Sequence, residues 1–507
     1  MIRGCRYFLF VVIFSFAWLA QSCEESAGDT PTSVTMDDLT AIADGKLSVD
    51  LQTVYQHLNK MSKSVGGQEE ASVFLRKYYQ DKNPLIWVRR SGVCDSSRRL
   101  LDVLKTAEED GFSTSLFRIK QIEKDLQRID SLDFDEQNTI NEVLARLELN
   151  LSKAYFCYAA VQQYGAVNPT VVLNKSQVIG DDTIKVTSRQ FDMKLHRPDD
   201  GFFTYAATVV PTDSFMPYLE NLKPQSPLYQ QFKDELKKAK GAEYRKKVLV
   251  NMERARWHLK DPVEKHDKYV LVNVASQTLV AMSKDSTMTM KVCCGTTGKK
   301  TPLLNSYIKK MDINPVWRMP YSIVKTIAGR AGNAAYFSSR RYSIYDGAGR
   351  KVNPANVTSA QLRSGKYSVV QAAGKGNSLG RIIFRFDNNF SVYLHDTNSP
   401  WVFKQGNRCV SHGCVRLERP FDMAVFLLGD KQADKAADVK YSMTHDPEPK
   451  DSIRDDRMLK ECKVDPEIPV YLTYYTLFPD RNQHLREYND VYGYDKIIYQ
   501  HLKAVTP

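Results

Sequence analysis

The sequence predicts an α+β protein, with a mainly α-helical N-terminal half followed by a β-rich domain. Two observations lead to this prediction. Apolar residues recur every three or four positions through much of residues 37–265, whereas after Asp261-Pro262 they alternate with polar residues in short runs. The length of 507 residues allows about two to four domains with a substantial core.

The helical half, residues 37–265, gives its clearest signal at residues 138–164. Apolar and aromatic side chains there recur at helical spacing, and Gly165 and Pro169 end the pattern. Similar patterns predict further helices over residues 96–112, 224–239 and 244–258. We interpret the aromatic and Met positions of these helices as core residues rather than as part of a cofactor site.

The second half carries period-two runs that predict β-strands over residues 269–273, 278–283, 287–294, 382–386, 391–395 and 470–476. Residues 301–380 hold Pro, Gly and aromatic residues without steady periodicity. A stretch this long inside a compact domain is usually a lid or a binding subdomain. We therefore predict a β-rich domain over residues 266–480 with a lid over about 301–380, and a C-terminal extension over residues 481–507.

The first residues predict export from the cytoplasm. Arg3 and Arg6 precede an apolar run, residues 8–20, that is too short to span a bilayer, as in a secretory signal peptide. Leu19-Ala20-Gln21-Ser22-Cys23 resembles a bacterial lipobox, in which the Cys becomes the lipidated first residue. We predict a signal peptide over residues 1–22, lipidation of Cys23 and a flexible tether over residues 23–36. Plain secretion and a retained signal anchor are the alternatives.

Composition and charge exclude several classes of protein. Hydrophobic residues make up 42% and charged residues 26% of the chain, which is ordinary for a globular protein and not for a disordered or fibrous one. The net charge of +12 fits an anionic partner. However, Lys and Arg are spread among acidic residues and form no basic stripe interleaved with aromatic residues. We therefore predict no nucleic-acid partner.

Nine cysteines are present, of which Cys5 leaves with the signal peptide and Cys23 is the predicted lipidation residue. The other seven are Cys94, Cys157, Cys293, Cys294, Cys409, Cys414 and Cys462. Because seven is odd, at least one thiol stays free or pairs between chains. Their spacing is not that of a small disulfide scaffold.

The stretch from His395 to Arg416 concentrates side chains that suit acyl transfer. A thiol such as Cys414 is a good nucleophile once its pKa, ordinarily about 8.5, falls, and a nearby imidazole such as His395 lowers it. Gly413 lets the backbone approach closely, so that adjacent amides can point at an oxyanion. Arg416, two residues after the thiol, offers a fork for a carboxylate.

Three alternatives compete with nucleophilic catalysis. Cys409, His412, Cys414 and His395 are of the types that bind zinc, but their spacing is unusual for it. A buried, inert cysteine with satisfied histidines is the second alternative. A nucleotide-binding P-loop at residues 295–301 fails, because the position that requires Gly is Cys293. We predict no metal and no cofactor.

His395, a gap of 15 residues and Ser411-His412-Gly413-Cys414-Val415-Arg416 resemble the signature of the YkuD-type L,D-transpeptidases. Further stretches resemble the larger Gram-negative members of that family, over about residues 70–500 in all: 84–88, 100–111, 164–169, 251–257, 314–320, 379–382, 393–397 and 469–472. Two features differ. Asp396 stands where many members have Gly, and the segment 231–244 leaves no room for the small peptidoglycan-binding module of the large members.

The resemblance implies a mainly helical scaffold domain, a YkuD-like catalytic domain and peptidoglycan cross-linking. The enzyme would attack the third residue of a tetrapeptide stem, release the terminal D-Ala and pass the acyl group to the side-chain amine of another stem. The product would be a 3→3 cross-link, and carbapenem β-lactams would be inhibitors. The site would lie in the periplasm of a Gram-negative bacterium, on a protein anchored to the membrane through its N-terminal lipid.

The resemblance also assigns roles to individual residues. Cys414 would be the nucleophile and His395 its base, oriented by the backbone carbonyl of Asp396. The oxyanion would be held by the backbone N–H groups of Gly413 and Cys414, with help from His412 and the neighbouring Ser411. Arg416 would hold a carboxylate or brace the loop, and the lid would supply Trp317 and Tyr321 as walls of the substrate site.

Two other functions remain open at this point. The same acyl-enzyme could pass its acyl group to water, as a murein L,D-carboxypeptidase or endopeptidase does. The chain could also be a non-catalytic, wall-associated lipoprotein, which predicts a damaged motif. Every residue of the motif is present, which favours an enzyme.

Overall fold

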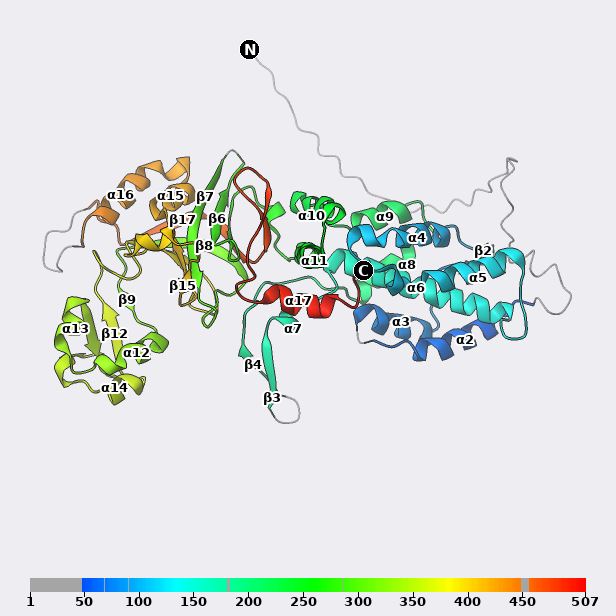
Figure 1. The fold of residues 1–507 in the computed structure, drawn as a ribbon, viewed down its shortest axis with the longest axis horizontal. Coiled ribbons are helices and arrows are strands. Elements are labelled where there is room, and N and C mark those ends of the chain that lie inside the picture. Colours follow the sequence, from blue (N-terminus) through cyan, green and yellow to red (C-terminus); the bar gives the residue numbers. More distant parts are fainter. Residues whose placement is uncertain (1–47, 68, 90, 180–182, 285, 448–455) are drawn as a thin grey trace, which may run out of the picture.

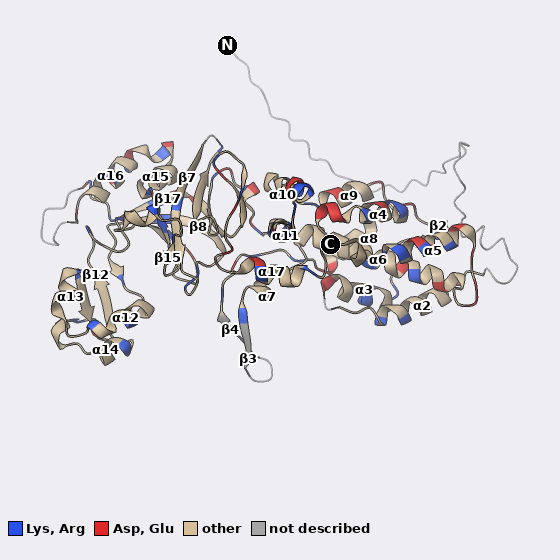
Figure 2. Cartoon of the chain, in the orientation of Figure 1, with Lys and Arg blue, Asp and Glu red and all other residues tan. Residues whose placement is uncertain are grey.

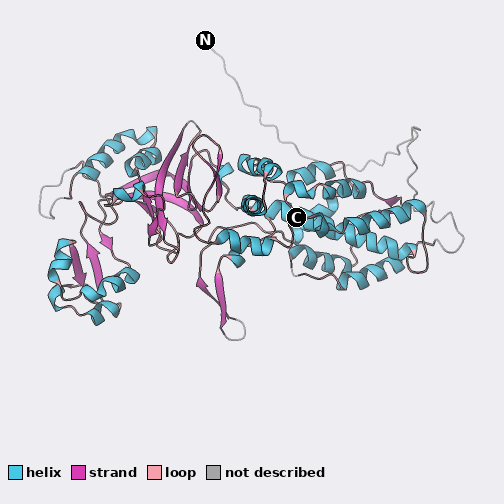
Figure 3. Ribbon diagram, in the orientation of Figure 1, coloured by secondary structure: helices cyan, strands magenta, loops and turns pink. Residues whose placement is uncertain are grey.

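The computed structural model describes residues 48–507, apart from residues 68, 90, 180–182, 285 and 448–455. It confirms the predicted α+β fold, with an N-terminal helical body followed by a β-rich domain (Figures 1 and 3). The helical body lies at one end of the molecule, a β-barrel lies in the middle, and a small α/β subdomain lies at the other end (Figure 1).

The helical body has its own core and is built around one long helix. Its helices are α2 (Leu51–Lys63), α3 (Glu70–Gln80), α4 (Ser96–Lys105), α5 (Ile119–Ser131), α6 (Ile140–Tyr164), α8 (Asp200–Val209) and α9 (Phe215–Asn221). The Thr139 side chain caps α6 by accepting from the Glu142 N–H, and Gly165 ends the helix at φ +78°. Because α6 is buried on nearly all sides, its neighbours pack around it as a central rod.

A buried carboxylate ties the segment before α4 to α6. Glu148, in the middle of α6, is fully buried and accepts hydrogen bonds from the Tyr79 hydroxyl and from the backbone N–H groups of Ile86, Trp87 and Val88. These four donors satisfy a group that would otherwise be costly to bury. Burial still raises the pKa of the Glu148 carboxyl.

The structure divides the predicted helical half differently at its C-terminal end. Helices α10 (Pro227–Lys238) and α11 (Ala242–Arg256) form close to the predicted ranges, but they pack into the core of the barrel and not into that of the helical body. A β-hairpin, β3 (Lys175–Ile179) and β4 (Thr183–Ser188), also interrupts the segment. An apolar helix face does not reveal from sequence which neighbour it will cover.

The β-rich domain is a nine-stranded sheet closed on itself. Its strands are β5 (Tyr269–Asn273), β6 (Thr278–Met282), β7 (Thr287–Gly295), β8 (Leu304–Ile313), β13 (Ile382–Phe386), β14 (Leu394–His395), β15 (Cys409–Ser411), β16 (Val415–Leu417) and β17 (Glu461–Thr473). They run in the order β15-β7-β16-β14-β13-β8-β17-β5-β6, and β6 also pairs with β7. This last pairing joins the edge strand β6 to β7, which lies next to the other edge strand, β15, so the sheet closes around an apolar core.

The lid begins later than the sequence predicted. Residues 304–313, assigned to the lid, are strand β8, which lies between β13 and β17 in the barrel. The burial of β8 does not alternate regularly, because Lys and Asp side chains share the strand with its buried residues, and this masked its period. The segment that leaves the barrel starts near Trp317 and returns near Gln371, where the two residues are register partners.

This segment, residues 317–371, is a subdomain with a separate apolar core. Its sheet has the order β11 (Lys351–Val352), β10 (Tyr342–Tyr345), β12 (Ser368–Gln371) and β9 (Trp317–Arg318). Helices α12 (Tyr321–Ile327), α13 (Ala334–Ser339) and α14 (Ser359–Arg363) complete it. Figure 1 shows that it lies away from the barrel and is joined to it by two connecting segments of chain.

The end of the chain returns toward the helical body. After α15 (Pro420–Leu428), α16 (Ala433–Thr444) and the hairpin of β18 (Leu477–Pro479) and β19 (Leu485–Glu487), helix α17 (Tyr494–Leu502) packs against α11. The carbonyl of Val505 then accepts a hydrogen bond from the N–H of Ser113 in the helical body. The C-terminal segment therefore joins the two halves of the molecule.

Basic and acidic side chains are interspersed over both halves of the described chain (Figure 2). No helix in that part of the chain is long and apolar enough to cross a membrane. The predicted signal peptide, the lipidation residue Cys23 and the tether lie outside the described residues.

Candidate active site

The parallel pairing of β14 with β16 brings the two halves of the motif together. Leu394 is the register partner of Val415, and His395 is the partner of Arg416. The N–H of Val415 donates to the carbonyl of Tyr393 at 3.0 Å, which extends the pairing toward the preceding residue, Cys414. Since side chains alternate along a strand, His395, Cys414 and Arg416 share one face of the barrel wall.

His395 is a buried imidazole oriented by a backbone carbonyl. Only 4% of the residue is exposed, and Nδ1 is hydrogen-bonded to the backbone carbonyl of Asp396. Because a carbonyl can only accept, this contact favours the tautomer with the proton on Nδ1, which leaves Nε2 to act as the base. Burial, together with the charge of Arg416, lowers the pKa of His395 to about 4.

Asp396 fits beside His395 because its carboxylate points elsewhere. The carboxylate accepts from the N–H of Arg381 at 2.8 Å and from the N–H of Thr397 at 2.7 Å. A Cβ atom at Gly380 would overlap the Asp396 side chain, so a glycine there makes room for it. The backbone carbonyl of Asp396 remains free to orient the imidazole, as the resemblance implies.

Ser411 and Thr301 hold the turn before the thiol. The Ser411 hydroxyl donates to the carbonyl of Cys414 at 2.6 Å and accepts from the N–H of Gly413 at 3.1 Å. The Thr301 hydroxyl donates to the carbonyl of Gly413 at 2.8 Å. Gly413 has φ +120°, a conformation that favours glycine. Thr301 was not predicted to take part, because nothing in its sequence context marks a contact across 112 residues.

The expected oxyanion donors are only partly free. The N–H of Gly413 is already used by Ser411, which corrects the expectation that both amides point at an oxyanion. The N–H of Cys414 has no acceptor among the described residues, so it is the amide available for this role. His412 is exposed, and burial of part of its ring lowers the pKa of the imidazole.

The Cys414 thiol is half-buried and, at rest, is not directed at the imidazole. Its Sγ atom donates to the backbone carbonyl of Ser391 at 3.9 Å. Burial raises the pKa of this thiol, against the opposing effects of the Tyr393 backbone N–H and the charges of Arg416 and Arg385. This corrects the expectation of a lowered thiol pKa. The resting pair is a neutral thiol and a neutral imidazole.

Arg416 offers an unused guanidinium next to the pair. Its Nε atom is buried and has no hydrogen-bond partner among the described residues, and none of their carboxylates forms an ion pair with it. A buried donor without a partner costs free energy, which a ligand oxygen would recover. The arrangement suits a carboxylate placed beside the thiol.

The two predicted lid residues make their contacts within the subdomain. Trp317 packs against the subdomain core, and the Tyr321 hydroxyl donates to the carbonyl of Arg363 while its ring lies over Gly365. Tyr321 is 45% exposed. A wall of the substrate site at these residues remains a prediction.

The zinc alternative has no support in the described part of the chain, where no group of three or more His, Cys, Asp or Glu side chains could hold a metal ion. Cys409, one of the residues considered for zinc, receives a hydrogen bond from the Gln277 side-chain amide at 3.3 Å.

Comparisons with known proteins identify two domains in this chain. Residues 267–434 match the model of the L,D-transpeptidase catalytic domain, YkuD, and residues 74–236 match that of a Scaffold domain. A Haemophilus influenzae protein named "Putative L,D-transpeptidase" is 25% identical over 313 residues, which span 60% of this chain and 60% of that protein.

A solved L,D-transpeptidase from Mycobacterium smegmatis is 16% identical, with a TM-score of 0.18, over 32% of this chain and 53% of that one. A TM-score this low does not bear on the fold. The two domain matches span the motif and the helical body described above. Together with the α+β fold, they show that the chain contains a Scaffold domain followed by an L,D-transpeptidase catalytic domain of the YkuD type.

Proposed function

We propose that this protein is a peptidoglycan L,D-transpeptidase that forms 3→3 cross-links through an acyl-thioester on Cys414. The observation that carries the proposal is the parallel register of β14 and β16, which places His395, Cys414 and Arg416 on one face. A free amide at Cys414 and an unpartnered guanidinium at Arg416 complete a site for an acyl group and a carboxylate.

Acylation begins from the neutral pair. As the Cys414 sulfur attacks the carbonyl of the third stem residue, the thiol proton passes to Nε2 of His395. The negative oxygen that develops accepts a hydrogen bond from the N–H of Cys414. The C–N bond to the terminal D-Ala then breaks, and the imidazolium returns its proton to the leaving amine. A thioester and free D-Ala are the products.

Transfer repeats these steps with a second stem. The side-chain amine of the acceptor attacks the thioester carbonyl and gives its proton to His395, and the C–S bond breaks. The proton then returns to sulfur, which regenerates the thiol and leaves a 3→3 amide bond. Water at about 55 M competes with the amine, so transfer requires an acceptor that is bound and aimed.

Product analysis tests this proposal. The purified mature protein is incubated with disaccharide-tetrapeptides, and the muropeptides are identified by mass spectrometry. Dimers with a 3→3 link, absent with Cys414→Ala, are the expected result. Tripeptide alone, even at high acceptor concentration, would indicate a carboxypeptidase, and cleavage of 3→3 dimers without new ones would indicate an endopeptidase. A carbapenem should add covalently to Cys414.

We also propose that Cys23 is lipidated and anchors the enzyme to a membrane facing the periplasm. The proposal rests on the lipobox-like sequence of residues 19–23. A single lipid chain binds a membrane only marginally, so firm anchoring needs a multiply acylated Cys. Cys23→Ala should move the protein into the soluble periplasmic fraction. If the variant stays with the membranes, the anchor lies elsewhere.

A further inference from the structure

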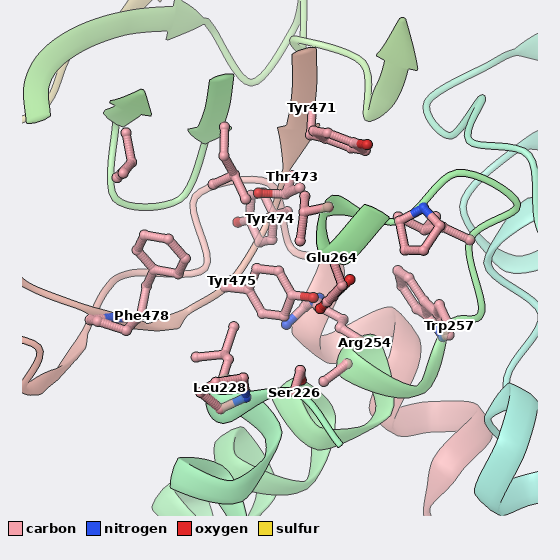
Figure 4. Close-up of a pocket in the computed structure, with 18 of the residues that line it drawn as sticks. Ser226, Leu228, Arg254, Trp257, Glu264, Tyr471, Thr473, Tyr474, Tyr475 and Phe478 are labelled. Atoms are coloured by element: carbon pink, nitrogen blue, oxygen red, sulfur yellow. The ribbon is translucent and has the colours of Figure 1, made fainter. Parts of the chain in front are cut away.

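A large cavity outside the motif separates the barrel wall from the helices that cover it. Its volume is about 1160 Å³, and none of the motif residues lines it. The outer side of β5 and β6 forms one wall, the end of α11 and the loop before α10 form another, and the turn after β17 forms a third (Figure 4). Its size exceeds that of most small-molecule pockets.

Aromatic rings line this cavity from several elements. Tyr475 and Phe478 are nearly parallel, with ring centroids 6.1 Å apart and an interplanar angle of 24°, and Phe232 lies 6.2 Å from Tyr475 on the same measure; we call the Tyr475 and Phe478 rings the platform. Trp257, directly after α11, also lines the cavity, on the opposite side of the view in Figure 4. Flat rings of this kind stack well on the apolar faces of sugar rings, whose hydroxyl groups stay at the edges.

A buried arginine reaches the same space with an unused donor. Arg254 is 4% exposed, and its Nη2 atom pairs with Asp495 at 2.6 Å. Its Nη1 atom is buried and has no hydrogen-bond partner among the described residues. An unsatisfied charged donor is costly in a protein interior, so this atom points to an oxygen acceptor on a ligand.

An acceptor lies beside this donor. The carboxylate of Glu264 is exposed and makes no hydrogen bond to a described residue. Figure 4 shows Glu264, Arg254 and the hydroxyl end of Tyr475 directed toward one another. A ligand that carries both hydroxyl donors and oxygen acceptors at the edge of a flat apolar ring fits this combination.

We propose that the cavity binds the glycan strand of peptidoglycan, with a sugar ring on the Tyr475–Phe478 platform and sugar oxygens on Arg254 and Glu264. This inference rests on the proposed function, because that function supplies a glycan-linked substrate. The cavity would hold the strand while a stem peptide attached to it occupies Cys414. It would thereby supply substrate capture in a chain whose α10 and α11 are joined by only residues 239–241.

Binding to the mature Cys414→Ala protein tests the proposal without turnover. Tyr475→Ala removes half of the platform, and Thr289→Trp fills the cavity without removing a side-chain hydrogen bond to a described residue. Matched controls lie on α8 outside the cavity: Tyr205→Ala, at a residue 61% exposed, and Thr208→Trp, at an exposed residue. Calorimetry then compares a disaccharide-tetrapeptide, a peptide-free glycan chain and a sugar-free tetrapeptide.

Both cavity variants should bind the disaccharide-tetrapeptide and the peptide-free glycan about tenfold more weakly, as expected for a lost stacking contact. The controls should bind as the parent does, and the sugar-free tetrapeptide should bind all five proteins alike. Unchanged glycan binding in both cavity variants would overturn the proposal, as would an equal loss for the sugar-free tetrapeptide.

Turnover separates this proposal from the proposed function. In proteins with an intact Cys414, the cavity variants should raise KM for the disaccharide-tetrapeptide and leave kcat unchanged. Cross-linking with no change in KM would refute the glycan site and leave the transpeptidase standing. If the parent protein makes no cross-links but the cavity variants lose glycan binding, the transpeptidase proposal is refuted and the glycan site is supported.

Discussion

At the scale of the residue, the proposed reaction starts from a neutral thiol, Cys414, and a neutral imidazole, His395. Burial raises the pKa of Cys414 and lowers that of His395 to about 4, so neither group is charged at neutral pH. A neutral thiol is a weak nucleophile, so in the proposed mechanism the proton moves to His395 as the sulfur attacks. The proposed mechanism therefore depends on the base at the moment of reaction and not on a preformed thiolate.

Replacing the thiol tests its role directly. Cys414→Ala should lower cross-linking on the order of 10⁴-fold or more, because no nucleophile remains. Cys414→Ser should be nearly as inactive, since a hydroxyl is far less acidic than a thiol. Muropeptide analysis measures the loss, and circular dichroism checks that the fold survives. A variant that cross-links at the parent rate would refute the assignment.

The pH dependence tests the state of the base. His395 is neutral, and able to accept a proton, above its pKa of about 4, which burial has lowered from the ordinary 6.5. The acid limb of kcat/KM should therefore fall near pH 4, and activity should persist at pH 5 and 6. His395→Ala should lower acylation more than His412→Ala does, because His412 is exposed and only assists. An acid limb near pH 6.5 would contradict the buried, neutral imidazole.

At the scale of elements, a short turn and a long insertion control the site. The turn from Ser411 to Cys414 is fixed by two hydroxyl groups, one within it and one from Thr301. The subdomain of residues 317–371 begins and ends at two paired strands, β9 and β12, next to its connections to the barrel. In the proposed mechanism, the first feature would position the nucleophile, and the second would exclude water and guide an acceptor.

Ser411→Ala should loosen the turn without removing a reacting group. The N–H of Gly413 and the carbonyl of Cys414 would lose their shared partner, and the amide of Cys414 would shift. Misplacement by about 1 Å costs up to roughly 100-fold in rate, so we expect a loss of 10- to 100-fold in kcat. Ser411→Thr, which keeps the hydroxyl, should restore part of it. Full activity in Ser411→Ala would show that the turn is held by other contacts.

Removal of the subdomain tests its part in transfer. Trp317 and Gln371 are register partners, so a short Gly-Ser linker can replace residues 317–371 without spreading the barrel. The Asn377 side chain, which lies outside the deleted segment, still joins the two flanking segments by donating to the carbonyl of Pro315 at 3.0 Å. We expect acylation of Cys414 to continue while the tripeptide-to-dimer ratio rises several-fold, because water reaches the thioester. An unchanged ratio would place acceptor binding elsewhere.

At the scale of the whole molecule, one buried amide links α11 to the barrel. The Asn251 side chain is fully buried, accepts from the N–H groups of Thr476 and Leu477, and donates to the Thr476 hydroxyl. Asn251→Ala would leave two buried N–H groups unsatisfied, which should lower the free energy of unfolding by roughly 2–4 kcal/mol. Thermal unfolding measures this loss. Glu243→Ala, at an exposed position of the same helix, should change the free energy of unfolding little. An equal loss in both variants would contradict a specific contribution of the buried Asn251 amide.

The amino-acid sequence by itself determined the fold class, the helix α6, strands β5 and β13 and the motif from His395 to Arg416. These rest on local periodicity and on residue types at fixed spacing, which the chain displays without folding. Strand β8 could not be predicted, because its half-buried residues do not alternate regularly. The packing of α10 and α11 against the barrel could not be predicted either, because an apolar helix face does not show which element it will contact.

Only the tertiary structure decided the state of the site. The raised pKa of the thiol, the use of the Gly413 amide by Ser411 and the contact from Thr301 depend on burial and on atoms brought together across the barrel. The same is true of the unpartnered nitrogens of Arg416 and Arg254. Desolvation and hydrogen-bond satisfaction are properties of the packed interior, and a linear sequence carries them only through the fold that it specifies.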